Sequence, residues 1–162
     1  MVMVILGILG VTLSTLLSTG VGAFMAGNKV ADTLSKLRLS SERIARELRT
    51  VRRDPAATTD FDFLSRTPTS VQFRRFENNG VTVTTVTLDT SGTNLRLAYN
   101  TPPGTFTLSD QLGSLALTYW QQDGTAATSD ANVAFVVIEL SLTDSNGNSY
   151  PQRTRVALRN RQ

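Results

Sequence analysis

The sequence predicts an α+β protein in which one long N-terminal helix packs on an antiparallel β-sheet of roughly six strands. Three observations lead to this fold class. No charged residue precedes Lys29, and a helical apolar repeat runs from Met1 to about Arg53. After residue 58 the pattern changes to alternating apolar and polar residues with turn signals between them. The 162 residues are enough for one compact domain.

The uncharged segment 1–28 is longer than the roughly 20 residues that a helix needs to cross a hydrocarbon core. A cleaved signal peptide is one alternative, but no Lys or Arg precedes the apolar run. A buried core helix is another, although a helix without a polar face is unusual in a small domain. We expect a membrane or filament-core helix whose apolar contacts come from Met1, Val4, Ile5, Leu6, Ile8, Leu9, Leu13, Leu16 and Leu17.

Residues 29–53 continue the same helix as an amphipathic segment. A 4,3 repeat predicts that one seam packs on the sheet, formed by Val30, Leu34, Leu37, Ile44, Leu48 and Val51. The same register extends backward into the first segment, which favours one uninterrupted helix. Pro55 is expected to end it near Arg53, because the residue before a proline avoids helical geometry. Residues 54–162 then form the β-rich domain.

The polar face of the amphipathic segment is rich in charge. Its simplest interpretation is a solvated helix face with i,i+4 ion pairs. A second interpretation is pairing with acidic groups of neighbouring subunits, for which the candidates are Arg43, Arg46, Glu47 and Arg49. No nucleic-acid partner is expected, because the net charge is only +3 and no aromatic residues interleave the arginines.

Six segments of the remainder have strand character: 71–76, 81–88, 95–99, 115–120, 135–142 and 154–159. Within the second, the alternation slips at Thr84-Thr85, which predicts a bulge or a register change. Pro102-Pro103-Gly104 is expected to break the third. The spacing of Asp144, Asn146 and Asn148 is faintly similar to the start of a calcium loop, but a hairpin turn is favoured because no bidentate Glu follows.

The chain has no cysteine and no histidine. Disulfides and thiolate metal sites are therefore excluded, and the commonest general base is missing. Chemistry by Ser with Lys, or by paired carboxylates, stays possible in principle, but no such pair stands out. We therefore predict no catalytic residues, no cofactor and no metal.

Five stretches resemble a known family. MVMVILGILG at the start resembles the apolar helix of the type IV pilin superfamily, and SERIARELR at 41–49 resembles a stretch of its minor members. Residues 115–124, together with 135–142 and 154–160, are similar to minor pilins of the PilW/MshO group and to GspJ pseudopilins. The resemblance implies that a leader, a methylated N-terminal residue and the FTLIE stretch lie upstream of Met1, where this sequence is expected to have been truncated.

That resemblance implies a non-catalytic subunit of a type IV pilus (a fimbrium) or a type II secretion pseudopilus. Its helix would span the bacterial inner membrane once, with the C-terminal domain in the periplasm. The implied partners are other pilins or pseudopilins of the same filament, the inner-membrane assembly platform and, before assembly, the lipid bilayer. The alternative is a membrane-anchored or secreted β-rich adhesin or binding domain outside any filament.

Overall fold

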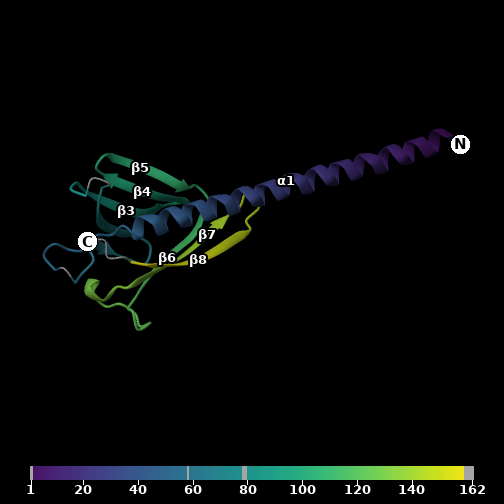
Figure 1. The fold of residues 1–162 in the computed structure, drawn as a ribbon. Helices are drawn as coiled ribbons and strands as arrows, with labels where there is room; N and C mark the ends of the chain where they lie inside the picture. The colour runs from purple at the N-terminus through teal and green to yellow at the C-terminus, as the bar shows by residue number, and fades with distance from the viewer. Residues whose placement is uncertain (1, 58, 78–79, 159–162) are drawn as a thin grey trace.

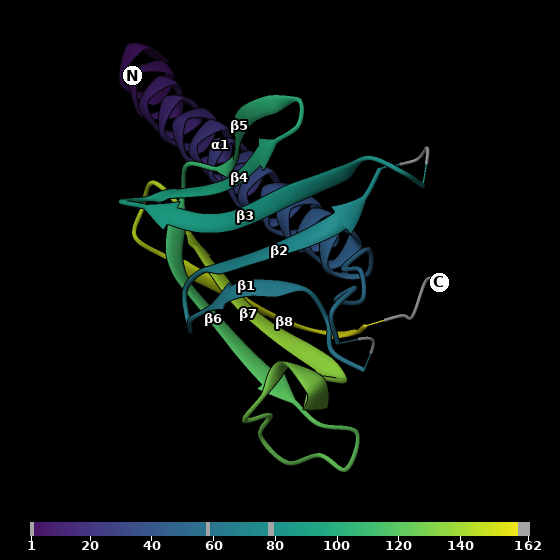
Figure 2. The ribbon, with the colours of Figure 1, turned by 90° about the vertical axis from the view of Figure 1, so that its left-hand side faces the viewer.

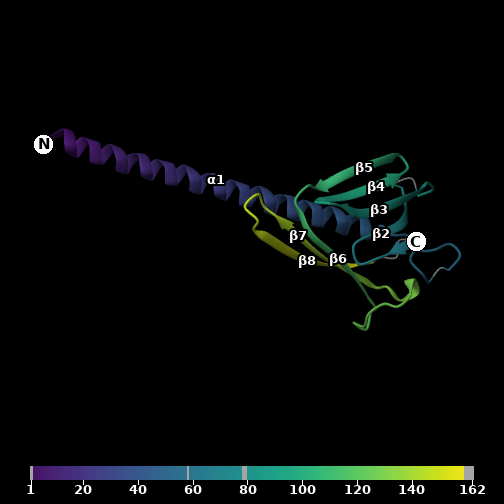
Figure 3. The same cartoon turned by 180° about the vertical axis from the view of Figure 1, so that it is seen from behind.

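The structure, a computed structural model, describes residues 2–57, 59–77 and 80–158, with side chains from Leu13 onward inside the helix. One helix, α1, spans Val2–Leu48. Its second part lies against the β-strands, whereas its first part projects away from them (Figures 1 and 3). The predicted fold class, a long N-terminal helix on antiparallel β-structure, is confirmed.

Two sheets are present where the sequence predicts one. The first contains five strands in the order β1-β2-β3-β4-β5, and the second three in the order β6-β7-β8, all antiparallel. In Figure 2, strands β2–β4 cross the helix and β6–β8 form a separate layer. The strands are β1 (Phe63–Arg66), β2 (Val71–Phe76), β3 (Val83–Ser91), β4 (Asn94–Asn100), β5 (Pro103–Ser109), β6 (Leu112–Trp120), β7 (Phe135–Thr143) and β8 (Ser149–Ala157).

Two of these strands, β1 and β5, are additional to the predicted six. Strand β1 has four residues and pairs with β2 through a register shift, so its own alternation is too short to recognise. Strand β5 begins at Pro103. A proline is tolerated there because it is the first residue of an edge strand and its missing N–H costs nothing in the ladder.

The prediction of a bulge or register change at Thr84-Thr85 is wrong. These residues pair in unbroken register with Arg75 and Arg74 of β2. Thr84 occupies a core-facing position and is fully buried, and its hydroxyl donates to the Thr101 carbonyl at 2.9 Å. The apparent slip arises because a satisfied polar residue takes a place that an apolar one usually fills.

Helix α1 ends at Leu48, about a turn earlier than predicted. The Thr50 hydroxyl donates to the Glu47 carbonyl at 2.6 Å, and the Arg52 amide donates to the Arg74 carbonyl of β2 at 3.0 Å. Main-chain bonds to the sheet therefore replace the next helical ones. Val51 lies beyond the helix, in a bridge with Arg75, and is buried there.

One hydrophobic cluster joins the helix to both sheets. Leu37, Ile44 and Leu48 are buried in it, and Val30 is half-buried. Leu34 does not belong to the seam, since 45% of it is exposed, and Thr33 is buried in its place. The physical reason is that a straight helix drifts by about 20° per heptad from a strict seven-residue repeat. The buried face has thus moved by one residue at its N-terminal end.

Candidate assembly surface

The projecting part of α1 exposes large apolar side chains. Leu16 and Leu17 are each 69% exposed and Phe24 is 71% exposed. Leu13, Val21 and Met25 are also exposed, and from Leu13 onward the first buried residue of the helix is Thr33. Soluble proteins rarely leave such a contiguous apolar surface open, and where they do it usually marks an interaction site.

Most of these side chains share one face of the helix. A shallow depression along it is lined by Leu13, Leu16, Leu17, Gly20, Val21 and Phe24, which recur at the three- and four-residue spacing of a single stripe. We call these six residues the apolar stripe. The hydroxyl of Thr19 donates back to the Thr15 carbonyl at 2.9 Å, so that polar group needs no outside partner.

Several predicted contact residues fall outside the side chains that the structure describes: Met1, Val4, Ile5, Leu6, Ile8 and Leu9. Leu13, Leu16 and Leu17 are described, and all three are exposed as part of the stripe. Within the described residues, no helix offers a stretch both long and apolar enough to span a membrane.

Polar contacts hold the second part of α1 against the sheets. The Ser40 hydroxyl donates to the Leu108 carbonyl of β5 at 3.1 Å, and the hydroxyls of Ser41 and Thr154 of β8 are 2.9 Å apart. Ser40 and Ser41 are buried. Because these bonds supplement the apolar seam on two different strands, the direction in which the helix leaves the domain is well defined.

The strongest of these contacts centres on Glu47. Its side chain is 7% exposed and lies 3.0 Å from the Arg43 guanidinium and 3.3 Å from that of Arg75 on β2. The Tyr99 hydroxyl of β4 donates to the same carboxylate at 2.9 Å. Burial, together with the Glu47 carboxylate, raises the pKa of Tyr99 despite the opposing guanidinium of Arg43. Glu47 is therefore buried and paired inside the chain, and its role as an inter-subunit charge stays a prediction.

The remaining predicted charges differ in their surroundings. Arg43 also donates to the Tyr99 hydroxyl at 2.9 Å. That hydrogen bond and the nearby Glu47 carboxylate raise the pKa of Arg43. Arg46 and Arg49 are exposed and have no ion pair within the described part of the chain. Of the four predicted charges, only Arg46 and Arg49 have no ion pair within the described chain and could pair with acidic groups of a neighbouring subunit.

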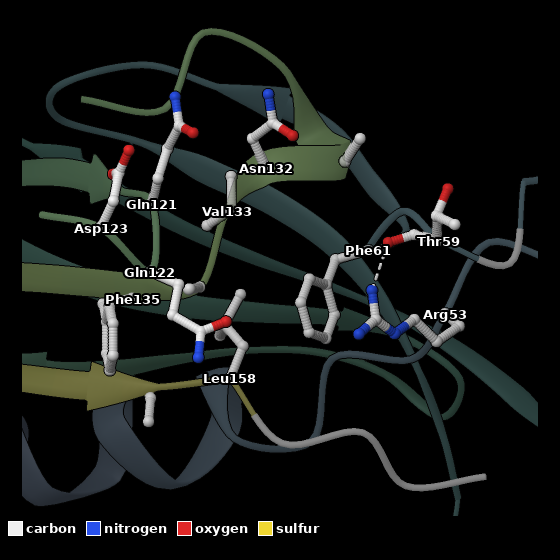
Figure 4. Close-up of a pocket in the computed structure, with 13 residues that line it drawn as sticks. Arg53, Thr59, Phe61, Gln121, Gln122, Asp123, Asn132, Val133, Phe135 and Leu158 are labelled. Atoms are coloured by element: carbon white, nitrogen blue, oxygen red, sulfur yellow. Dashed lines mark hydrogen bonds between the residues drawn. The ribbon is translucent and has the colours of Figure 1, made fainter. Parts of the chain in front are cut away.

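A separate cavity of about 600 Å³ lies at the far end of the β domain (Figure 4). Arg53 donates to the Thr59 carbonyl there, and its guanidinium lies 4.0 Å from the ring centre of Phe61. Asp123 accepts hydrogen bonds from the amide and hydroxyl of Thr125, which lower its pKa. The charged side chains that line the cavity, Arg53 and Asp123, each bind their own neighbours and do not form an acid–base pair with one another.

The turn with the faint calcium-loop spacing is a hairpin between β7 and β8. The Asp144 carboxylate accepts from the amides of Asn146 and Asn148 and from the Tyr150 hydroxyl, with Gly147 at φ 85. Donors thus surround the carboxylate where a cation would need oxygen ligands. Over the described residues, no cluster of three or more potential metal-ligating side chains is found.

Comparison with protein-family models, with curated proteins and with solved structures finds no match to this chain.

Proposed function

We propose that the chain is a structural subunit of a filament of the type IV pilin kind, a minor pilin or pseudopilin that assembles through α1. The observation that carries this proposal is the apolar stripe, which projects beyond the β domain and has no partner within the described chain. A neighbouring helix can cover it completely, because the stripe has the spacing of a helix-packing face.

The energy available for assembly is considerable. Fully burying one Leu, Val or Phe side chain contributes about 1.5–3 kcal/mol, so the stripe and its neighbour Met25 together offer on the order of 10 kcal/mol. Gly20 lies within the stripe, and a Cβ at that position would meet nothing within the chain. A partner helix can approach closely at such a small residue.

In this proposal the helix holds the subunit in a bacterial inner membrane before assembly, and the β domain is periplasmic. Lipid contacts are then exchanged for contacts with the helices of other pilins or pseudopilins, with the help of the assembly platform. The contacts of Ser40, Ser41 and Glu47 support this role, since they keep the projecting helix in a fixed direction relative to the domain.

Site-specific crosslinking tests the proposal. The chain has no cysteine, so Leu16→Cys and Phe24→Cys each introduce a single reactive thiol on the stripe. Treated with a short bismaleimide in the organism of origin, these variants are expected to crosslink to a cysteine placed in the apolar N-terminal helix of another filament subunit. Exposed Leu64→Cys on β1 is the matched control and is expected to give no such product.

Two results would contradict the proposal. One is the absence of helix-to-helix crosslinks together with absence of the protein from sheared filaments. The other is recovery of the full-length protein as an isolated membrane-anchored or secreted domain that binds a surface on its own. The second result would favour the adhesin alternative.

A further inference from the structure

Among the described residues the two sheets have four edge strands, and β8 is the longest whose main chain receives no hydrogen bond from outside its own sheet. Strand β1 has only four residues, and β6 is covered where Leu117 donates to the Pro68 carbonyl at 2.7 Å. On β5, the Leu108 carbonyl accepts the Ser40 hydroxyl of α1. Strand β8 has nine residues, pairs with β7 along its whole length and, among the described residues, has no strand on its other side.

Pro151 shows which main-chain groups of β8 are free. It lies opposite Ser141 of β7, and a proline cannot donate the N–H that a hydrogen-bonded pair requires. The pair is therefore of the non-hydrogen-bonded kind, and the alternation of an antiparallel ladder turns the amides and carbonyls of Arg153 and Arg155 away from β7. These are the groups that an added strand needs.

A cationic groove runs beside this edge. It has a volume of about 340 Å³ and lies between the last turns of α1 and β8, with Gln152 and Thr154 on the strand and Arg46 and Arg49 on the helix. Arg46 and Arg49 are three residues apart and so share a helix face. The one carboxylate lining it, Glu42, is paired with Arg38 at 2.9 Å.

We propose that β8 accepts an extended acidic segment of another protein, which adds to the sheet as a further strand and places carboxylates against Arg46 and Arg49. Main-chain hydrogen bonds to the open edge supply affinity, and the two arginines supply the preference for acidic side chains. A second copy of this chain is disfavoured, because pairing β8 with itself brings Arg153 and Arg155 of both copies together. This inference is independent of the filament proposal.

Fluorescence anisotropy tests it with the full chain in a mild nonionic detergent. The probe is a labelled nine-residue peptide in which glutamate alternates with valine. The first control is the same peptide with N-methyl groups on its four central amides, which cannot pair with an edge strand. A second control has lysine in place of glutamate, and a single-stranded DNA oligonucleotide of similar charge is the third. We expect binding of the first peptide only.

Two pairs of variants separate the contributions of the edge and the charges. Arg153, like Pro151, is at a position of β8 whose N–H points away from β7, so a proline fits there without breaking the pairing with β7. Arg153→Pro therefore removes only an outward N–H, and we expect it to weaken binding about tenfold or more. Arg153→Thr removes the same side chain but keeps the N–H, and should retain most of the affinity. The double variant Arg46→Glu with Arg49→Glu should abolish binding, whereas Lys29→Glu, at an exposed position of the same helix outside the groove, should not.

Circular dichroism spectra and thermal midpoints establish that each variant is folded. Equal binding of the N-methylated peptide or of DNA would overturn the inference, because it would show a general polyanion surface. Equal loss in Arg153→Pro and Arg153→Thr would also overturn it, as would the absence of peptide binding at millimolar concentration.

Discussion

At the scale of single residues, the chain places several polar groups inside its core and satisfies nearly all of them. Glu47 illustrates this most clearly. It lies in the last turn of α1, where a carboxylate is unfavourable with respect to the helix dipole, yet two arginines and a tyrosine from three elements converge on it. A buried charge of this kind is stable only while its partners remain.

We therefore expect Glu47→Gln to lower the free energy of unfolding by about 2 kcal/mol, because the largely buried Arg75 guanidinium loses one of its two carboxylate partners and keeps only Glu77. Glu42→Gln on the same helix is the matched control, with an expected loss below about 0.5 kcal/mol since its pair with Arg38 is exposed. Urea denaturation of both variants measures the difference. Equal changes in the free energy of unfolding would show that the burial of Glu47 does not strengthen its ion pairs.

Among the described residues, three buried side-chain atoms have no hydrogen-bond partner; those of Arg75 and Asp130 lie in ion pairs, whereas the Tyr119 hydroxyl does not. Removing it in Tyr119→Phe keeps the ring, which contacts the Arg66 guanidinium at 5.0 Å and Phe63 edge-on. We expect the free energy of unfolding to stay the same or rise by about 1 kcal/mol. A clear loss in a chemical denaturation experiment would reveal a partner that stabilises the hydroxyl.

The same tyrosine predicts a pH dependence. Burial raises the pKa of Tyr119 from 10.0 to about 12, with Arg66 opposing the effect. The folded state therefore favours the neutral phenol. The contribution of Tyr119 to the free energy of unfolding is complete below pH 10 and is lost as the pH rises to about 12. We expect a fall of roughly 2 kcal/mol across that window in the wild type, and a smaller fall in Tyr119→Phe. Identical pH profiles of the two proteins would contradict the assignment.

At the scale of elements, α1 consists of two parts with different surroundings. Its second part is buried on one face by both sheets, and the exchange of Leu34 for Thr33 shows that the face follows the true helical period. The single proton of the Thr33 hydroxyl is shared between two acceptors, the Lys29 carbonyl at 3.1 Å and the Gln111 side-chain oxygen at 3.3 Å, so this polar residue is buried at little cost.

A pair of substitutions tests this face. Leu37→Ala is expected to lower the free energy of unfolding by about 3 kcal/mol, because Leu37 is only 4% exposed. Leu34→Ala makes the same chemical change on the same helix, and its expected cost is below about 1 kcal/mol. Thermal or urea unfolding distinguishes them. A larger loss of stability at Leu34 would support the predicted seam with its strict heptad spacing.

At the scale of the whole molecule, the folded domain and the projecting helix are nearly independent. The hydrophobic cluster includes no described residue before Leu37, and the N-terminal part of α1 extends away from both sheets (Figures 1 and 3). A shortened chain of residues 29–162 should therefore keep its strand content and its unfolding midpoint within a few degrees.

The same shortened chain should lose the association that the stripe provides. We expect the full chain to require detergent and to self-associate without it, while the shortened chain sediments as a monomer. Analytical ultracentrifugation and circular dichroism measure both properties. Failure of the shortened chain to fold would show that the N-terminal segment contributes to the core after all.

Local patterns were sufficient for part of this structure. The long helix, its change of character near Lys29 and six of the eight strands follow from apolar spacing, and the hairpin at Asp144 follows from its turn residues. These features depend on the conformational preferences of neighbouring residues, which the sequence records directly. The burial of Leu37, Ile44 and Leu48 belongs to the same class.

Only the tertiary structure decided the rest. The division into two sheets, the short strand β1 and the edge strand β5 depend on pairing between distant segments. So do the end of the helix at Leu48, the burial of Thr84 and the conversion of Glu47 from an apparent surface charge into a buried one. In each case a partner far away in the chain satisfies a polar group or replaces a local hydrogen bond, and no local pattern encodes that partner.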